Sequence, residues 1–77
     1  MERTIEAARR FIENGGKCLY RYGWGWKGAQ CRPMTKDEAL KELPKYDFGI
    51  GFYELSWPKV GNEQVLEFNE LSENDML

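Results

Sequence analysis

The sequence predicts one small α+β domain spanning residues 1–77. Its expected order is helix, hairpin, helix, hairpin, with a mostly antiparallel four-stranded sheet and both helices on one face. Two segments, 5–12 and 39–43, carry apolar side chains at helical spacing. Two others, 18–33 and 46–68, alternate apolar with polar or small residues and contain glycine-bearing turn signals. The chain of 77 residues is short enough that one core must serve all of these elements.

The first helix is expected to begin after Thr4, whose side chain can cap it, and to run to about Glu13. Asn14-Gly15-Gly16 should end it, because Asn and Gly readily adopt the left-handed conformation of a helix terminus. One apolar stripe marks its buried side: Ile5, Ala8, Phe11 and Ile12.

The first hairpin is predicted from a run of alternating aromatic residues. One strand face would carry Cys18, Tyr20, Tyr22, Trp24 and Trp26. A turn at Trp26-Lys27-Gly28 would return the chain as a second strand from Ala29 to Pro33. That turn leaves the two cysteines, Cys18 and Cys31, out of register, whereas a turn centred on Trp24-Gly25 would place them opposite each other. We favour free thiols.

The second helix is predicted over about Lys36 to Leu43, because Thr35 and Glu38 have the spacing of a capping box. Pro44 should end it, since the residue before a proline avoids helical backbone angles. Its expected buried residues are Ala39, Leu40 and Leu43.

The second hairpin is expected to run from Tyr46 through a turn at Gly61-Asn62. Counting back from that turn pairs Leu55 with Phe68 and Ser56 with Glu67, so apolar meets apolar and polar meets polar. The predicted core is Leu40, Leu43, Leu55, Trp57, Leu66 and Phe68.

The apolar residues change parity within this hairpin. A β-bulge near Phe52-Tyr53 would explain the change. Otherwise the three even-numbered residues Phe48, Ile50 and Phe52 lie on the sheet face away from the helices. Residues 72–77 are expected to form a frayed acidic tail.

The composition argues against catalysis. The chain has no His and only two Cys, so the usual zinc sites and histidine-based acid–base pairs are missing from it. We therefore predict a non-enzymatic protein with no catalytic residue, no metal and no cofactor. No apolar run is long enough to cross a membrane, and the charged N-terminal segment is unlike a signal peptide, so a cytoplasmic location is expected.

The aromatic and basic hairpin is the expected binding surface. Trp, Tyr and Arg are the residues that dominate protein-binding hot spots. Residues 17–36 carry five bases and no acid, whereas residues 61–77 carry acids and no base, which suggests a basic face and an acidic edge. A scatter of solvated charges is the alternative. The candidate site residues are Arg21, Tyr22, Trp24, Trp26, Lys27 and Arg32.

These side chains favour a protein partner. The alternative is single-stranded nucleic acid, which binds to alternating aromatic and basic residues by base stacking. The pI of about 5.1 argues against that alternative, because phosphate binding needs a basic footprint. Trp24 and Trp26 would lose this role if both folded back onto the sheet.

Two segments of the second half of the chain suggest where the protein comes from: residues 45–54 (KYDFGIGFYE) and residues 66–77 (LEFNELSENDML). These segments resemble small uncharacterised proteins of phages and mobile elements of Gram-positive gut bacteria. The resemblance covers the second half of the chain and extends to the Gly-Trp-Gly-Trp-Lys-Gly segment. It implies no known activity and no site residues.

Overall fold

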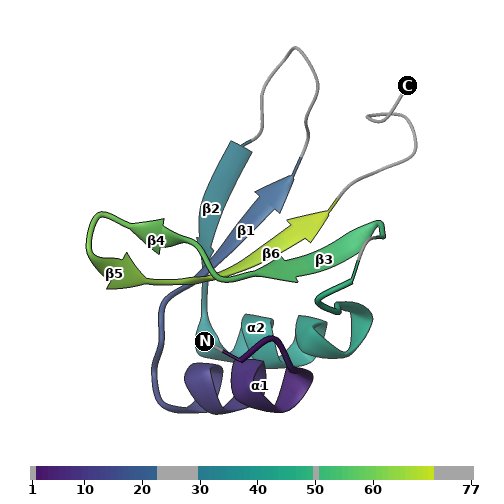
Figure 1. Ribbon diagram of the computed structural model, residues 1–77, viewed down its shortest axis with the longest axis horizontal. Helices are drawn as coiled ribbons and strands as arrows, with labels where there is room; N and C mark the ends of the chain where they lie inside the picture. The colour runs from purple at the N-terminus through teal and green to yellow at the C-terminus, as the bar shows by residue number, and fades with distance from the viewer. Residues whose placement is uncertain (1, 23–29, 50, 71–77) are drawn as a thin grey trace.

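The chain folds as a four-stranded sheet with two helices beneath it and a short two-stranded ribbon at its side (Figure 1). The computed structural model describes residues 2–22, 30–49 and 51–70. Within these residues the elements are α1 (Ile5–Glu13), β1 (Cys18–Tyr22), β2 (Gln30–Met34), α2 (Lys36–Glu42), the 3₁₀ helix η1 (Leu43–Lys45), β3 (Tyr53–Ser56), β4 (Lys59–Val60), β5 (Glu63–Gln64) and β6 (Leu66–Glu70). The predicted α+β class is confirmed.

The strand order in the main sheet is β2-β1-β6-β3. The β1–β2 and β3–β6 pairs are antiparallel, whereas β1 and β6 run parallel at the centre. The sheet is therefore mixed, although antiparallel pairs predominate as predicted. Strands β4 and β5 pair only with each other and extend the second hairpin beyond the sheet.

The first helix agrees with its predicted bounds. Thr4 Oγ1 accepts a hydrogen bond from the Ala7 amide at 3.1 Å, which satisfies one of the free donors of the first turn. At the other end Gly15 adopts a positive φ of 83°. The predicted stripe faces the core, with Ala8 and Ile12 buried and its other two members half-buried.

The second helix begins at the predicted capping box. Glu38 N donates to Thr35 Oγ1 at 3.1 Å, and Thr35 N donates to Glu38 Oε1 at 3.3 Å. Its end differs from the prediction, because the chain tightens into η1 with Pro44 near its start instead of leaving the helix. Proline is tolerated there, since the first residues of a helix have no intrahelical partner for their N–H groups.

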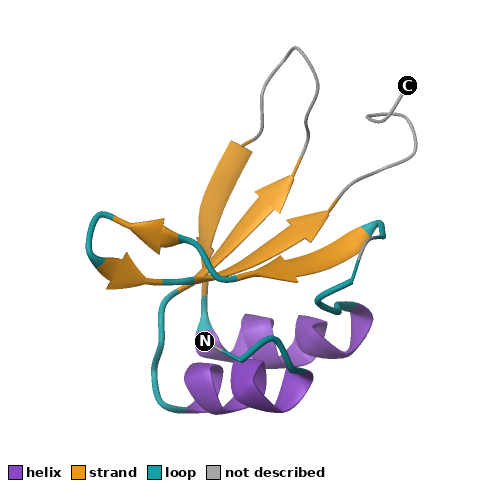
Figure 2. Cartoon of the chain, viewed as in Figure 1, coloured by secondary structure: helices purple, strands orange, loops and turns teal. Residues whose placement is uncertain are grey.

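The core lies between the sheet and the helices, which share one side of it in Figure 2. Of the predicted core residues, four are fully buried, and Leu40 and Trp57 are only half-buried at its margin. Cys18 and Tyr46 also belong to the buried cluster. Among the described residues, neither helix is long and apolar enough to span a membrane.

The predicted register of the second hairpin is confirmed. Leu55 pairs with Phe68 and Ser56 with Glu67. The pairing continues across β4 and β5 to Val60 and Glu63, which leaves Gly61-Asn62 as the turn, with φ of 67° at Gly61. A positive φ at the first turn residue is what a primed turn requires.

The start of that hairpin was predicted wrongly. The strand begins at Tyr53, not at Tyr46, and Asp47 instead forms an isolated parallel bridge with Glu54. The chain thus loops back on itself between these two residues. This loop, and not a β-bulge near Phe52-Tyr53, accounts for the change of parity.

The aromatic residues of this loop do not share the face away from the helices. Phe48 packs against the core and stacks on Trp57 with ring centroids 5.6 Å apart. Phe52 is exposed, and Ile50 lies outside the described residues.

Both cysteines are free, as expected. Cys18 pairs in register with Met34, and Cys31 with Arg21. This register rules out the alternative turn that would have brought the two thiols together.

Candidate functional site

Tyrosine side chains gather on the helix-side face of the sheet, at the end of the strands that the helices leave uncovered. We call Tyr20, Tyr22, Tyr46 and Tyr53 the tyrosine cluster. The outermost row across the sheet is formed by residues paired in register: Gln30, Tyr22, Glu70 and Tyr53. Tyr22 is 36% exposed and Tyr53 is 44% exposed, so both rings are accessible.

The Tyr20 side chain lies in the middle of a stack. Its ring stacks on Tyr22 with centroids 5.0 Å apart and planes inclined by 23°. The Arg32 guanidinium lies over the same ring, 5.0 Å from the centroid, which is within cation–π range. The Tyr22 hydroxyl donates to Gln30 Oε1 at 3.1 Å. These contacts hold the exposed ring of Tyr22 in one orientation.

Tyr46 connects the cluster to the core. It is buried, and its ring meets Phe68 edge-on at 5.0 Å and Tyr53 edge-on at 5.3 Å. Edge-on aromatic pairs contribute about 0.5–1.5 kcal/mol beyond the area that they bury. The buried ring of Tyr46 therefore holds the Tyr53 ring on one side, while the rest of the Tyr53 side chain stays in contact with solvent.

Glu70 lies among these tyrosines. Its Oε2 accepts a hydrogen bond from the Tyr20 hydroxyl. Burial, this hydrogen bond and the charge of Glu70 raise the pKa of Tyr20 to about 12. Burial first, and then the nearby Tyr20, Glu70 and Glu42, raise the pKa of Tyr46. Both phenols therefore stay protonated at neutral pH and can donate hydrogen bonds.

The predicted basic face is not found among the described residues, because its arginines are paired with acids. Arg32 contacts Glu38 through two N–O distances of 3.0 and 3.4 Å. This pair lowers the pKa of Glu38. Arg21 lies 3.7 Å from Glu67. The parallel pairing of β1 with β6 brings the basic and acidic segments side by side, so their charges offset each other.

The predicted site residues do not all share one surface. Tyr22 and Arg32 belong to the helix-side face. Arg21 alternates with Tyr22 along β1 and therefore lies on the opposite face. Trp24, Trp26 and Lys27 lie outside the described residues.

The opposite face carries a polar network. The sequence predicted its pairing of Ser56 with Glu67 but not the burial of Asn69. Asn69 is only 8% exposed, and its Nδ2 donates to Glu54 O and to Ser56 Oγ, both at 3.1 Å. Ser56 Oγ donates in turn to Glu67 Oε1 at 3.4 Å. The alternation of β6 placed Asn69 on this face, but alternation carried no signal that it would be buried.

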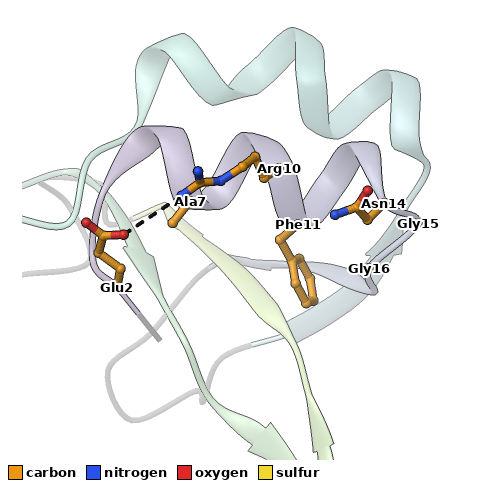
Figure 3. Close-up of a pocket in the computed structure, with 7 residues that line it drawn as sticks. All are labelled: Glu2, Ala7, Arg10, Phe11, Asn14, Gly15 and Gly16. Atoms are coloured by element: carbon orange, nitrogen blue, oxygen red, sulfur yellow. Dashed lines mark ion pairs between the residues drawn. The ribbon is translucent and has the colours of Figure 1, made fainter.

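A concave surface lies along α1, away from the tyrosine cluster. Figure 3 shows a groove between the N-terminal segment and the turn after the helix, lined by Glu2, Ala7, Arg10, Phe11, Asn14, Gly15 and Gly16. Glu2 and Arg10 form a weak ion pair at 3.8 Å across one end. This groove shares no lining residue with the tyrosine cluster.

The part of the chain that the structure describes contains no group of three or more His, Cys, Asp and Glu residues placed to hold a metal ion. Comparison with protein-family models, curated proteins and solved structures finds no match. The resemblance to phage and mobile-element proteins therefore stays a prediction, and function must be argued from the surface itself.

Proposed function

We propose that the chain is a small non-enzymatic protein-interaction module that binds a partner protein through its first hairpin. One observation carries the proposal: Tyr22 is exposed, yet its ring is held by stacking on Tyr20. The Tyr20 ring is itself held by the Arg32 guanidinium, which lies over it. A fixed aromatic ring loses little conformational entropy on binding, which is why Tyr is common at binding hot spots.

The charges around the hairpin support a protein partner over single-stranded nucleic acid. Stacked tyrosines with an arginine suit either ligand. However, Glu38 already engages Arg32, and Glu70 lies on the same face. A phosphate backbone would meet these carboxylates without a compensating basic surface, which opposes binding.

The face of the hairpin suits binding better than its edge. Strand β2 is an edge strand, but Pro33 has no N–H to offer an added strand. The Pro33 carbonyl accepts a weak hydrogen bond from Arg32 at 3.4 Å. Strand addition at this edge would therefore lack the main-chain donor at Pro33, so we place the contact on the side chains.

Affinity purification of the tagged full chain from its native host tests the proposal. Tyr22→Ala should abolish recovery of the partner, while Val60→Ala, which truncates an exposed side chain on β4, should leave it unchanged. The sequence-based prediction for Trp24→Ala with Trp26→Ala is the same loss of capture with little loss of stability.

Two results would count against the proposal. Recovery of the partner by Tyr22→Ala at the parent level would remove the hairpin from the interaction. Saturable, salt-dependent quenching of tryptophan fluorescence by a single-stranded oligonucleotide would favour the nucleic-acid alternative instead.

A further inference from the structure

Two exposed tyrosines flank one carboxylate at the uncovered end of the sheet. Tyr22 of β1 and Tyr53 of β3 both pair in register with Glu70 of β6, which lies between them. Neighbouring strands are about 4.8 Å apart, so the two tyrosine backbones are separated by roughly 10 Å. The register therefore places one exposed aromatic residue on each side of Glu70.

The charge of Glu70 is not offset by an ion pair with any described residue. The nearby basic side chains have other partners: Arg32 pairs with Glu38, and Lys45 Nζ lies 3.1 Å from Glu42 Oε2. One oxygen of Glu70 accepts from Tyr20, and its other oxygen accepts no hydrogen bond from the residues that the structure describes. Glu70 is half-buried, so the site holds a partly exposed, negatively charged acceptor beside electron-rich rings.

We propose that Tyr22, Glu70 and Tyr53 form a recognition site for an arginine side chain of the protein partner. The inference rests on the proposed function and specifies the chemistry of that partner. A guanidinium can donate to the free oxygen of Glu70 while it stacks on a tyrosine ring, and both contacts favour arginine over a neutral side chain. The site therefore selects a basic partner, although the sequence of the hairpin is itself basic.

The probe that tests this site is the peptide acetyl-Gly-Arg-Gly-amide, titrated into the ¹⁵N-labelled full chain and followed by amide chemical shifts. The control peptide carries citrulline, which has nearly the shape of arginine but no charge. Shifts should concentrate at Tyr22, Tyr53 and Glu70. The arginine peptide should bind about five- to tenfold more tightly than the citrulline peptide.

Two carboxylates on one strand provide a matched pair of variants. Glu70→Gln removes the charge from the proposed site and should reduce the preference for arginine to less than about twofold. Glu67→Gln removes the same charge from β6 on the opposite face and should leave that preference unchanged. If Glu70→Gln fails to fold, Tyr53→Leu removes an exposed ring and should weaken arginine binding about threefold.

Equal binding of both peptides, or parent-like discrimination by Glu70→Gln, would overturn the inference. Its failure can be told apart from failure of the proposed function. A partner lost on Tyr22→Ala but captured equally by the parent and Glu70→Gln would leave the interaction module standing and remove the arginine site. A partner captured equally by all three would remove both.

Discussion

We predict that a glycine is required at position 16 because a larger residue would collide with a neighbouring side chain, and not because the backbone there adopts a conformation that only glycine favours. A Cβ added there would lie 2.5 Å from Cδ2 and Cζ of Phe11. Carbon atoms in contact sit about 3.5 Å apart, so the ring must retreat by roughly 1 Å. A displaced Phe11 ring would lose part of its edge-on contact with Trp57, whose ring centroid lies 5.2 Å away. Gly16→Ala should therefore cost about 1–3 kcal/mol, as overpacking does.

The neighbouring glycine provides the contrast. Gly15 has a φ of 83°, and an added Cβ there would meet nothing within 4 Å. Gly15→Ala should cost about 1–2 kcal/mol through left-handed backbone strain alone. Each kcal/mol lost from the free energy of unfolding lowers the melting temperature of a domain of this size by about 4–8 °C. Thermal and denaturant unfolding can therefore measure the loss in both variants.

A second substitution separates the two causes. Phe11→Leu shortens the side chain that the new Cβ would strike, so it should recover part of the loss in Gly16→Ala and none of the loss in Gly15→Ala. A double-mutant cycle should give a coupling of about 1 kcal/mol with Gly16 and near zero with Gly15. Equal coupling at both positions would refute the steric argument.

Three further predictions concern the core, the phenols and the thiols. Phe68→Ala should cost about 3–5 kcal/mol in denaturant unfolding, since the side chain is fully buried at the centre of the sheet, and a change below about 1 kcal/mol would contradict this. Because the pKa of Tyr20 rises from 10.0 to about 12 in the fold, its contribution to stability should be complete below pH 10 and lost between pH 10 and 12; Tyr20 titrating near pH 10 by NMR would contradict this. Burial raises the pKa of the Cys18 thiol to about 11, so a thiol reagent at neutral pH should label exposed Cys31 in the native protein and Cys18 only after unfolding, with the melting temperature unchanged by reductant. Rapid native labelling of both thiols, or of neither, would be inconsistent with this.

Local signals predicted the elements well because each depends on neighbouring residues. The capping box at Thr35 and Glu38 and the turn at Gly61-Asn62 are set by residues one to three positions apart. The register of the second hairpin followed from that turn. Tyr46 was misplaced in a strand because periodicity cannot distinguish a strand from a loop that carries aromatic residues at similar spacing.

The arrangement of the elements could not be predicted in the same way. The parallel contact of β1 with β6 joins residues 48 positions apart, as in the pairing of Cys18 with Leu66, and no local pattern specifies it. This contact determines the candidate site, because it places Glu70 beside Tyr22 and Glu67 near Arg21. Of the tyrosine cluster, the sequence predicted only Tyr22 as a site residue. The other three tyrosines and the electrostatic character of the site depend on long-range contacts and were not predicted.

The central position of β6 has a consequence for the order in which the chain folds. Strand β1 has β2 on one side but needs β6 on the other, and β3 joins the sheet only through β6. During synthesis, one side of β1 therefore stays unpaired until residues 66–70 have left the ribosome, although the elements from α1 to α2 are already complete. Closing this long-range contact late should make folding slow for so short a chain and cooperative throughout. Until then, the open edge of β1 is the segment most exposed to pairing with another chain.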